Sequence, residues 1–255
     1  MTLRAFRHRI ALALTLGLLS GMPLTALATP YTPPPGLGLP GPREGAGTRG
    51  CLFGDPAQLV ALMPENNVGW TTAAYPRFYW FLPLNTASYA EFVLRYVDAD
   101  TQEEFEVYRT RFAPIGEAGI VTLGIPEDLG VLPLSVGDRY RWEVSLFCEP
   151  DSAPAEFRVQ GWIERRDPSE ALAEQLATTD TEADRIALYA SNGYWFNALD
   201  GLIQQKKAFP NDAEIQAAWA DFLASVRLET LATQPIWGTM PEADVLEMDE
   251  TEPQP

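Results

Sequence analysis

The spacing of apolar residues changes once along this chain, and that change limits the folds it can adopt. From Leu59 to Ile163, apolar and polar residues alternate with a period of two, interrupted by clusters of turn-forming residues. After Ile163 the apolar residues recur every three to four positions. Alternation is typical of strands that bury one face, and the longer spacing is typical of amphipathic helices. The sequence therefore predicts an α+β chain with strands first and helices second.

The first region predicts a set of short strands that each collect large apolar residues on one face. The predicted strands are 59–63, 77–82, 89–97, 104–112, 119–125, 140–148 and 157–163. About seven short strands in about one hundred residues are expected of an immunoglobulin-like antiparallel β-sandwich. Tyr140 begins a strand three residues after Gly137, as in a tyrosine corner, where the phenol bonds to upstream backbone. The alternative is a buried strand tyrosine without that bond.

The second region predicts four helices, at 167–178, 180–192, 194–209 and 212–226. Asp180 or Thr181 would cap the second helix, and Pro210 would stop the third. Small and apolar residues in the second and third helices are similar in pattern to one tetratricopeptide unit. A plain helical hairpin packed on the sandwich is the alternative.

The first 28 residues have the features of a secretory signal peptide. Three arginines precede an apolar run at 10–19, and Ala26-Leu27-Ala28 gives the small-x-small pattern that signal peptidase reads. The apolar run is too short to span a membrane. We therefore expect export to the periplasm or the outside of the cell, with no membrane anchor after cleavage. Cleavage would also remove His8, the only histidine.

Composition divides the chain into segments. Residues 1–28 form the signal peptide, 29–50 a Pro/Gly-rich tether, 51–166 the sandwich domain, 167–232 the helical region and 233–255 an acidic tail. We expect the tether to run extended without contributing to a core. The tail is expected to be disordered, because it combines acids with few large apolar residues.

The chain is strongly acidic. Its net charge is −17, and cleavage of the signal peptide would lower this to −20 because three arginines and no acid are removed. Negative charge of this size repels phosphate backbones and anionic lipids, so nucleic acid and membrane surfaces are not expected as partners. The charge can simply keep an exported protein soluble, or it can supply an acidic site for cations or basic partners.

Cys51 and Cys148 are the only cysteines. In an oxidising compartment an isolated pair is usually a disulfide. A redox-active thiol would need a CxxC motif or basic neighbours, and Cys148 is followed by Glu149 and Asp151. We predict a structural disulfide between Cys51 and Cys148.

Few groups remain for catalysis or metal binding once His8 is removed. A serine or cysteine nucleophile would lack an imidazole base, and zinc sites normally use His and Cys. The segment 45–50 matches GxGxxG, but a Pro/Gly tether precedes it and no helical pattern follows. Glu143, on an outward strand position, is a candidate for one of two carboxylates that could hydrolyse glycosides. We expect no cofactor, no metal and no catalytic residue.

Aromatic side chains occupy both faces of the predicted strands. If the tryptophans of strands 77–82 and 140–148 point inward, four aromatic residues point outward, namely Tyr79, Phe81, Phe147 and Trp162. In an immunoglobulin-like topology their strands share one sheet. An exposed row of this kind would be a ligand or partner face. The alternative, which we expect, is that the C-terminal helices cover this face and bury their apolar stripes there.

Several segments resemble a known family. They are GPREGAGTRGC at 41–51, LVALMPENNVGWTTAAYPRFYWFLP at 59–83, VGDRYRWEVSLFC at 136–148, GWIERR at 161–166 and GYWFNALDGL at 193–202. Together they resemble the cyanobacterial secreted family catalogued as domain of unknown function 928, over residues 38–232. The resemblance implies export and pairing of the two cysteines. It implies no reaction, so it assigns no catalytic residue.

These observations favour a non-catalytic exported protein that binds or scaffolds an unknown protein or glycan. One alternative is a carbohydrate-binding module that uses the outward aromatic face. Another is a carboxylate-based hydrolase. An open aromatic face would favour the first alternative, and a cleft with two carboxyl groups about 5–10 Å apart would favour the second.

Overall fold

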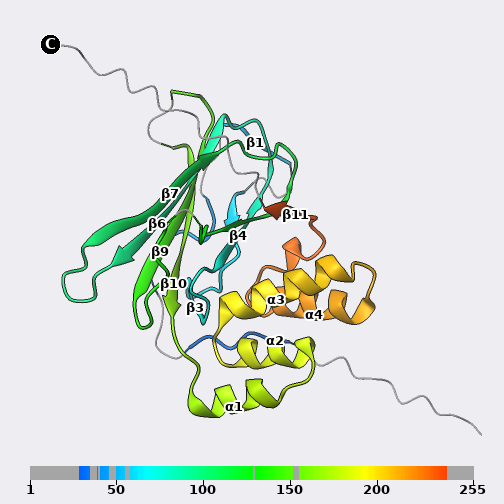
Figure 1. Cartoon of the computed structure of the whole chain (residues 1–255). Coiled ribbons are helices and arrows are strands. Elements are labelled where there is room, and N and C mark those ends of the chain that lie inside the picture. Colours follow the sequence, from blue (N-terminus) through cyan, green and yellow to red (C-terminus); the bar gives the residue numbers. More distant parts are fainter. Residues whose placement is uncertain are drawn as a thin grey trace, which may run out of the picture.

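The strands precede the helices in the structure, as the sequence predicts. The computed structural model describes residues 29–34, 39, 41–45, 50–54, 58–128, 130–151 and 155–239. The predicted signal peptide at 1–28 and most of the predicted acidic tail lie outside the described residues. Within these residues the fold is α+β, with two stacked sheets and a group of helices at one end of them (Figure 1).

The larger sheet has five strands in the order β3-β10-β9-β6-β7. Their bounds are β3 Val68–Thr71, β6 Tyr89–Val97, β7 Glu104–Phe112, β9 Arg139–Phe147 and β10 Phe157–Arg165. Neighbours are antiparallel except for β3, which runs parallel to β10. Because side chains alternate along a strand, Trp142 of β9 lies on the inner face, and Arg141 and Glu143 lie on the outer face.

The smaller sheet has four strands in the order β11-β8-β4-β2. Their bounds are β2 Val60–Ala61, β4 Arg77–Leu82, β8 Gly119–Gly124 and β11 Ile236–Thr239. β2, β4 and β8 are antiparallel, and β11 runs parallel to β8. A separate two-stranded pair joins β1 (Leu52–Phe53) to β5 (Leu84–Asn85).

Aromatic side chains join the inner faces of the two sheets. The ring centroid of Phe78 on β4 lies 5.0 Å from that of Phe92 on β6 and 5.5 Å from that of Trp142 on β9. Trp80 of β4 lies 6.0 Å from Phe112 of β7. All five side chains are buried. Removal of this much aromatic surface from water is a main source of the free energy that holds the sheets together.

The seven predicted strands correspond to β2, β4, β6, β7, β8, β9 and β10. Four further strands of the described chain were not expected, namely β1, β3, β5 and β11. β1 and β5 pair with each other in the antiparallel sense, whereas β3 and β11 each pair in parallel with a strand of a larger sheet. The prediction of an all-antiparallel sandwich is therefore wrong at these two pairs. β11 also lies inside the predicted acidic tail, so the prediction of disorder for 233–255 is wrong at residues 236–239.

The predicted tether is attached to the fold at several described positions. Tyr31 is buried in the hydrophobic core, where its ring lies edge-on to Trp195 with 4.9 Å between centroids. Arg43 donates hydrogen bonds to the carbonyl oxygens of Met63 and Val226, at 3.2 Å and 2.8 Å. The expectation that this tether contributes nothing to a core is therefore wrong. The many prolines and glycines around Tyr31 gave no pattern from which its burial could be predicted.

Tyr140 makes the bond that its sequence context predicts. The backbone N–H of Ser135 donates to its hydroxyl oxygen at 2.9 Å. Gly137, between the two residues, has a φ of +90°, which glycine adopts without strain. Closure of the phenol onto upstream backbone is confirmed.

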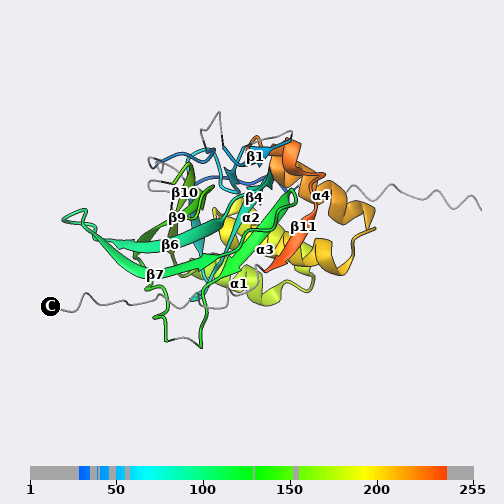
Figure 2. The same ribbon diagram turned by 90° about the horizontal axis from the view of Figure 1, so that it is seen from above.

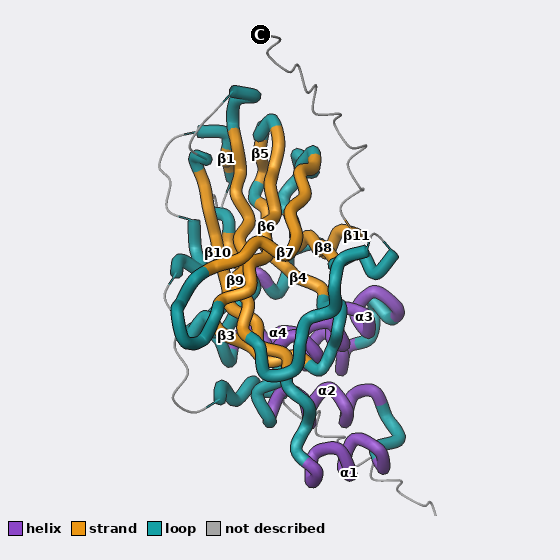
Figure 3. Tube along the Cα trace, turned by 60° about the vertical axis from the view of Figure 1, so that its left-hand side comes forward, coloured by secondary structure: helices purple, strands orange, loops and turns teal. Residues whose placement is uncertain are grey.

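The helices of the described chain after β10 are α1 (Glu170–Thr178), α2 (Glu182–Ser191), α3 (Trp195–Ala208) and α4 (Ala213–Ala224), followed by the 3-10 helix η1 (Glu229–Leu231). α3 lies nearest the strands, against β3 and β4, and α1 lies farthest from them, as Figure 1 and Figure 3 show. From above, the β6–β7 hairpin extends away from the helices (Figure 2).

Candidate functional site

The four aromatic residues of the predicted ligand face do not share one sheet. Tyr79 and Phe81 lie on β4 of the smaller sheet, whereas Phe147 and Trp162 lie on β9 and β10 of the larger sheet. The prediction of one shared face is wrong, because β4 pairs with β2 and β8 rather than with β9. Alternation predicts which face of its own strand a side chain occupies. It does not predict which strands pair with one another.

Tyr79 and Phe81 lie beneath other parts of the molecule and are 1 % and 0 % exposed. The Tyr79 hydroxyl donates a hydrogen bond to the carboxylate of Asp200 on α3. Arg77 reaches the same carboxylate, with 3.2 Å between nitrogen and oxygen. Burial, and then the Asp200 charge, raise the pKa of Tyr79 above its usual range, so this phenol remains a donor. This half of the predicted face is a contact between sheet and helix.

Phe147 and Trp162 lie on the outer face of the larger sheet, far apart. Phe147 stacks on Tyr89 with 4.3 Å between centroids. Trp162 pairs with Arg141 of β9, six residues from Phe147, a separation of about 20 Å along the strand. It is 8 % exposed, and it lines a cavity of about 210 Å³ together with Tyr96. These two residues therefore do not form one aromatic platform.

Charged residues also occupy this outer face. Three buried glutamates each bind two arginines there, namely Glu91 with Arg109 and Arg111, Glu143 with Arg141 and Arg158, and Glu164 with Arg139 and Arg166. The Glu143 oxygens lie 3.5 Å and 3.4 Å from guanidinium nitrogens. Both oxygens of the predicted catalytic candidate thus face cations, and an ion pair accounts for the position of Glu143.

Cys51 and Cys148 form a disulfide, with 5.4 Å between their Cα atoms. It links the chain next to β1 to the end of β9. The Cys51 carbonyl also accepts a hydrogen bond from the Thr86 N–H at 2.9 Å. The pair anchors the strands at one end of the sheets, away from the helices.

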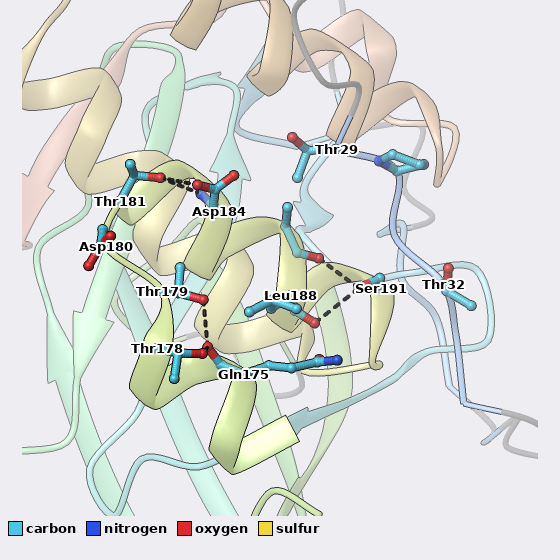
Figure 4. A pocket seen from close by; sticks show the side chains of 12 residues that line it. Thr29, Thr32, Gln175, Thr178, Thr179, Asp180, Thr181, Asp184, Leu188 and Ser191 are labelled. Atoms are coloured by element: carbon cyan, nitrogen blue, oxygen red, sulfur yellow. Dashed lines mark hydrogen bonds between the residues drawn. The ribbon is translucent and has the colours of Figure 1, made fainter. Parts of the chain in front are cut away.

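Two cavities adjoin α2, and neither was predicted from the sequence. The first, of about 780 Å³, lies between α1, α2 and the segment that begins at Thr29 (Figure 4). Its walls carry many hydroxyl groups. Those of Thr178, Thr179 and Ser191 donate to backbone carbonyls of their own helices, and that of Thr181 donates to Asp184. With their hydrogens engaged, these oxygens can only accept from a ligand, so the cavity favours a ligand rich in donors.

The second cavity, of about 550 Å³, lies between α2, α3 and α4. Ile186, Leu202 and Ile215 supply apolar surface, and Phe209 stands at its edge with 55 % of its area exposed. Asp184, Asp212 and Glu214 add carboxylates. Thr29, Thr181, Asp184 and Ala187 belong to both cavities, so the two adjoin and form what we call the helical cleft.

Helix capping explains why the helical cleft is acidic. Thr181 caps α2 by accepting from the Asp184 N–H at 3.1 Å, and Asp212 caps α4 by accepting from the Glu214 and Ile215 N–H groups. Both helices thus begin at the cleft, where acids are favoured by capping and by the helix dipole. Only one oxygen of Asp184 and of Asp212 is engaged within the described residues. Three residues of the sequence could have indicated this site, namely the capping residues Thr181 and Asp212 and the apolar residue Phe209 between α3 and α4.

The cleft combines four acids with no base. Asp180, Asp184, Asp212 and Glu214 line its two cavities, and no lysine, arginine or histidine is among the lining residues. In the described residues no cluster of three or more His, Cys, Asp or Glu is placed to bind a metal ion. The arrangement offers acceptors and negative charge beside apolar surface.

Comparison with known proteins gives a family and no function. No described helix is long and apolar enough to cross a membrane. No curated protein matches the chain. The family model described as Domain of Unknown Function (DUF928) matches residues 44–236, which is most of the chain, including both sheets and the helices. The chain belongs to this family.

Proposed function

We propose that this chain is an exported, non-catalytic binding protein whose helical cleft holds a basic, amphipathic segment of a partner protein. The observation that carries the proposal is the composition of the cleft walls, which combine an apolar floor and four carboxylates with no basic side chain. A partner segment with apolar residues on one side and Lys or Arg on the other would match both features.

Apolar contact would supply the affinity. Phe209 is largely exposed beside Ile215 and Leu202, and covering one large apolar side chain is worth about 1.5–3 kcal/mol. The carboxylates would supply selectivity, because an acidic segment in the same position would be repelled. Hydroxyl oxygens that can only accept hydrogen bonds would add partners for ammonium or guanidinium groups.

The architecture and compartment are part of this proposal. The two sheets would form an immunoglobulin-like sandwich, and α2 with α3 a tetratricopeptide-like hairpin that presents the cleft. The predicted signal peptide and the Cys51–Cys148 disulfide support a periplasmic or extracellular location. A cyanobacterial source stays an expectation from the resemblance.

The alternatives have less support. A carbohydrate-binding face would need Tyr79, Phe81, Phe147 and Trp162 together, and these side chains lie on two sheets. The carboxylate-hydrolase alternative was based on Glu143, and both oxygens of that residue face arginines.

The test uses two labelled peptides of equal length, an amphipathic helix of Leu and Lys and its counterpart with Glu in place of Lys. Fluorescence anisotropy measures their affinity for the disulfide-bonded protein. We expect the Lys peptide to bind, the Glu peptide to bind far more weakly, and added salt to weaken the Lys complex.

Variants locate the contact. Asp212→Asn removes a charge but keeps a good helix cap, so the protein should remain folded while the Lys peptide binds about 3–10-fold more weakly. Asp221→Asn, an exposed acid of α4 outside the cleft, is the matched control and should leave affinity unchanged. Equal binding of the two peptides, or equal loss in both variants, would contradict the proposal.

A further inference from the structure

Thr29 stands at the junction of the two cavities of the helical cleft. It is 6 % exposed and lines both of them, as does Asp184 of α2. In Figure 4 it lies on the segment that passes over α2, with Asp184 and Thr181 across the cavity from it. Thr29 is thus an enclosed residue at the start of a segment rich in Pro and Gly.

The residues that follow hold Thr29 in place. The Tyr31 N–H donates to the Ser225 hydroxyl at 3.0 Å, and the Tyr31 hydroxyl donates to the Gly193 carbonyl at 3.2 Å. The Thr32 N–H donates to the Ala190 carbonyl at 3.0 Å. These bonds join the segment to α4, to the α2–α3 turn and to α2. The segment that follows Thr29 is therefore fixed against the helices that form the cleft, and Thr29 itself lines both cavities.

The sequence predicts that signal peptidase cleaves between Ala28 and Thr29. Hydrolysis of that amide consumes one water, and the new carboxylate leaves with residues 1–28. The new amine stays on Thr29 and takes up a proton at neutral pH. Before cleavage the same nitrogen carries no charge and a single hydrogen; afterwards it is an ammonium with three.

We propose that this new α-ammonium group is bound in the helical cleft, with the Asp184 carboxylate as its principal partner. Every charged group among the residues that line the two cavities is an acid, namely Asp180 before α2, Asp184 on α2, Asp212 before α4 and Glu214 on α4. The nearest base on α2, Arg185, is committed to Glu182 and to the carbonyls of Leu176 and Thr179. The cleft thus supplies acceptors and negative charge where cleavage creates a cation.

Cleavage of the signal peptide would then release the exported chain and would also add a stabilising contact to its fold. The ammonium would neutralise part of the charge that the caps of α2 and α4 bring together, and would tie the N-terminal segment to α2. The inference does not rest on the proposed partner, because three of the four acids would remain for a basic ligand.

The contribution has a definite pH dependence. An α-amino group in an unfolded chain titrates near pH 7.7–8.0, roughly, and the surrounding acids favour its charged form in the folded chain. The folded pKa would therefore be raised. The stabilisation would be complete below about pH 7.7 and lost as the pH rises through the folded value.

The test uses the exported, processed protein. Lys206 and Lys207 are its only lysines, so in the Lys206→Arg/Lys207→Arg background the α-amine is the single primary amine. Mass spectrometry should find Thr29 as the first residue. A water-soluble carbodiimide, which joins an amine to a carboxylate in contact with it, should link Thr29 to Asp184.

Acetylation of that amine gives the energetic measurement. We expect the acetylated protein to melt about 3–6 °C lower near pH 6, with the difference vanishing near pH 10. Asp184→Asn should remove both the link and most of the effect of acetylation, whereas Asp221→Asn should change neither. A different first residue, no link between Thr29 and Asp184, or equal melting of free and acetylated protein would each overturn the inference.

Discussion

Replacing Trp195 by alanine should destabilise the entire described fold, because this side chain joins the helices to the sheets. Trp195 is 0 % exposed, and its indole N–H donates to the Leu62 carbonyl at 2.9 Å. Its ring stacks on Phe222 of α4 with 4.6 Å between centroids and meets the edge of Tyr31. One side chain thus contacts the chain after β2, the N-terminal segment and α4.

The magnitude follows from these contacts. Truncation of a buried tryptophan to alanine costs about 3–5 kcal/mol through lost transfer free energy and the remaining cavity. Trp195→Phe keeps much of the ring contact but leaves the buried Leu62 carbonyl without its donor, which costs about 1–3 kcal/mol. Since domains are stable by about 5–15 kcal/mol, the alanine variant should lose a large share of the total.

Urea unfolding monitored by circular dichroism measures both variants. Near-ultraviolet signals report aromatic packing and far-ultraviolet signals report helix, and their transitions should coincide if helices and sheets unfold as one unit.

Trp237→Phe is the matched control. Its indole donates to the Ala118 carbonyl at 3.1 Å from a half-buried position, where water can replace the bond, so we expect a loss below about 1 kcal/mol. A loss below about 1 kcal/mol for Trp195→Ala, or helices that melt while the sheets remain folded, would refute the reasoning.

Two further predictions concern the sheets. Cys148→Ala opens the bond to Cys51, which closes a loop across a sequence separation of 97, so it should cost about 2–5 kcal/mol in urea unfolding; peptide mapping without reductant should recover the linked pair, and two free thiols in exported protein would contradict it. Tyr140→Phe removes the acceptor of the Ser135 N–H and should cost about 0.5–1.5 kcal/mol, whereas an unchanged unfolding midpoint would mean that water replaces the bond.

The local pattern of the sequence predicted individual elements well. Strands 77–82, 89–97 and 104–112 were predicted with the bounds that β4, β6 and β7 have. Helix ends agree to within a few residues because capping residues such as Thr181 mark them. These features depend on alternation and on caps, which are properties of neighbouring residues.

The two unpredicted parallel strands depend on distant residues instead. β3 contains Gly69 and β11 contains Gly238, and glycine weakens a strand pattern. At Gly69 a Cβ atom would lie 2.6 Å from the Cβ of Trp195, so a larger residue would displace the tryptophan. Gly69 makes β3 hard to recognise in the sequence, and the same glycine is required because Trp195 of α3 packs against it.

The candidate site was missed for the same reason. Alternation placed Tyr79 and Trp162 on outward faces, but it could not say that their strands belong to different sheets. In the sequence, the acids of the cleft could be recognised only as residues at helix N-termini and as part of a large net negative charge. Their meeting depends on how α2 and α4 pack against α3, which no local pattern encodes.

The acids of the chain are distributed differently on its two surfaces, the outer face of the larger sheet and the helical cleft. On the outer face of the larger sheet, Glu91, Glu143 and Glu164 are each neutralised by two arginines, so that face presents no excess of negative charge despite its many acids. In the helical cleft the acids have no arginine or lysine among the lining residues. In the proposed function, a basic partner would be attracted more strongly to the cleft than to the paired sheet face, and the helices would select it. Tyr79 and Trp195 join those helices to the chain of the smaller sheet, and the N-terminal segment is bonded to α4.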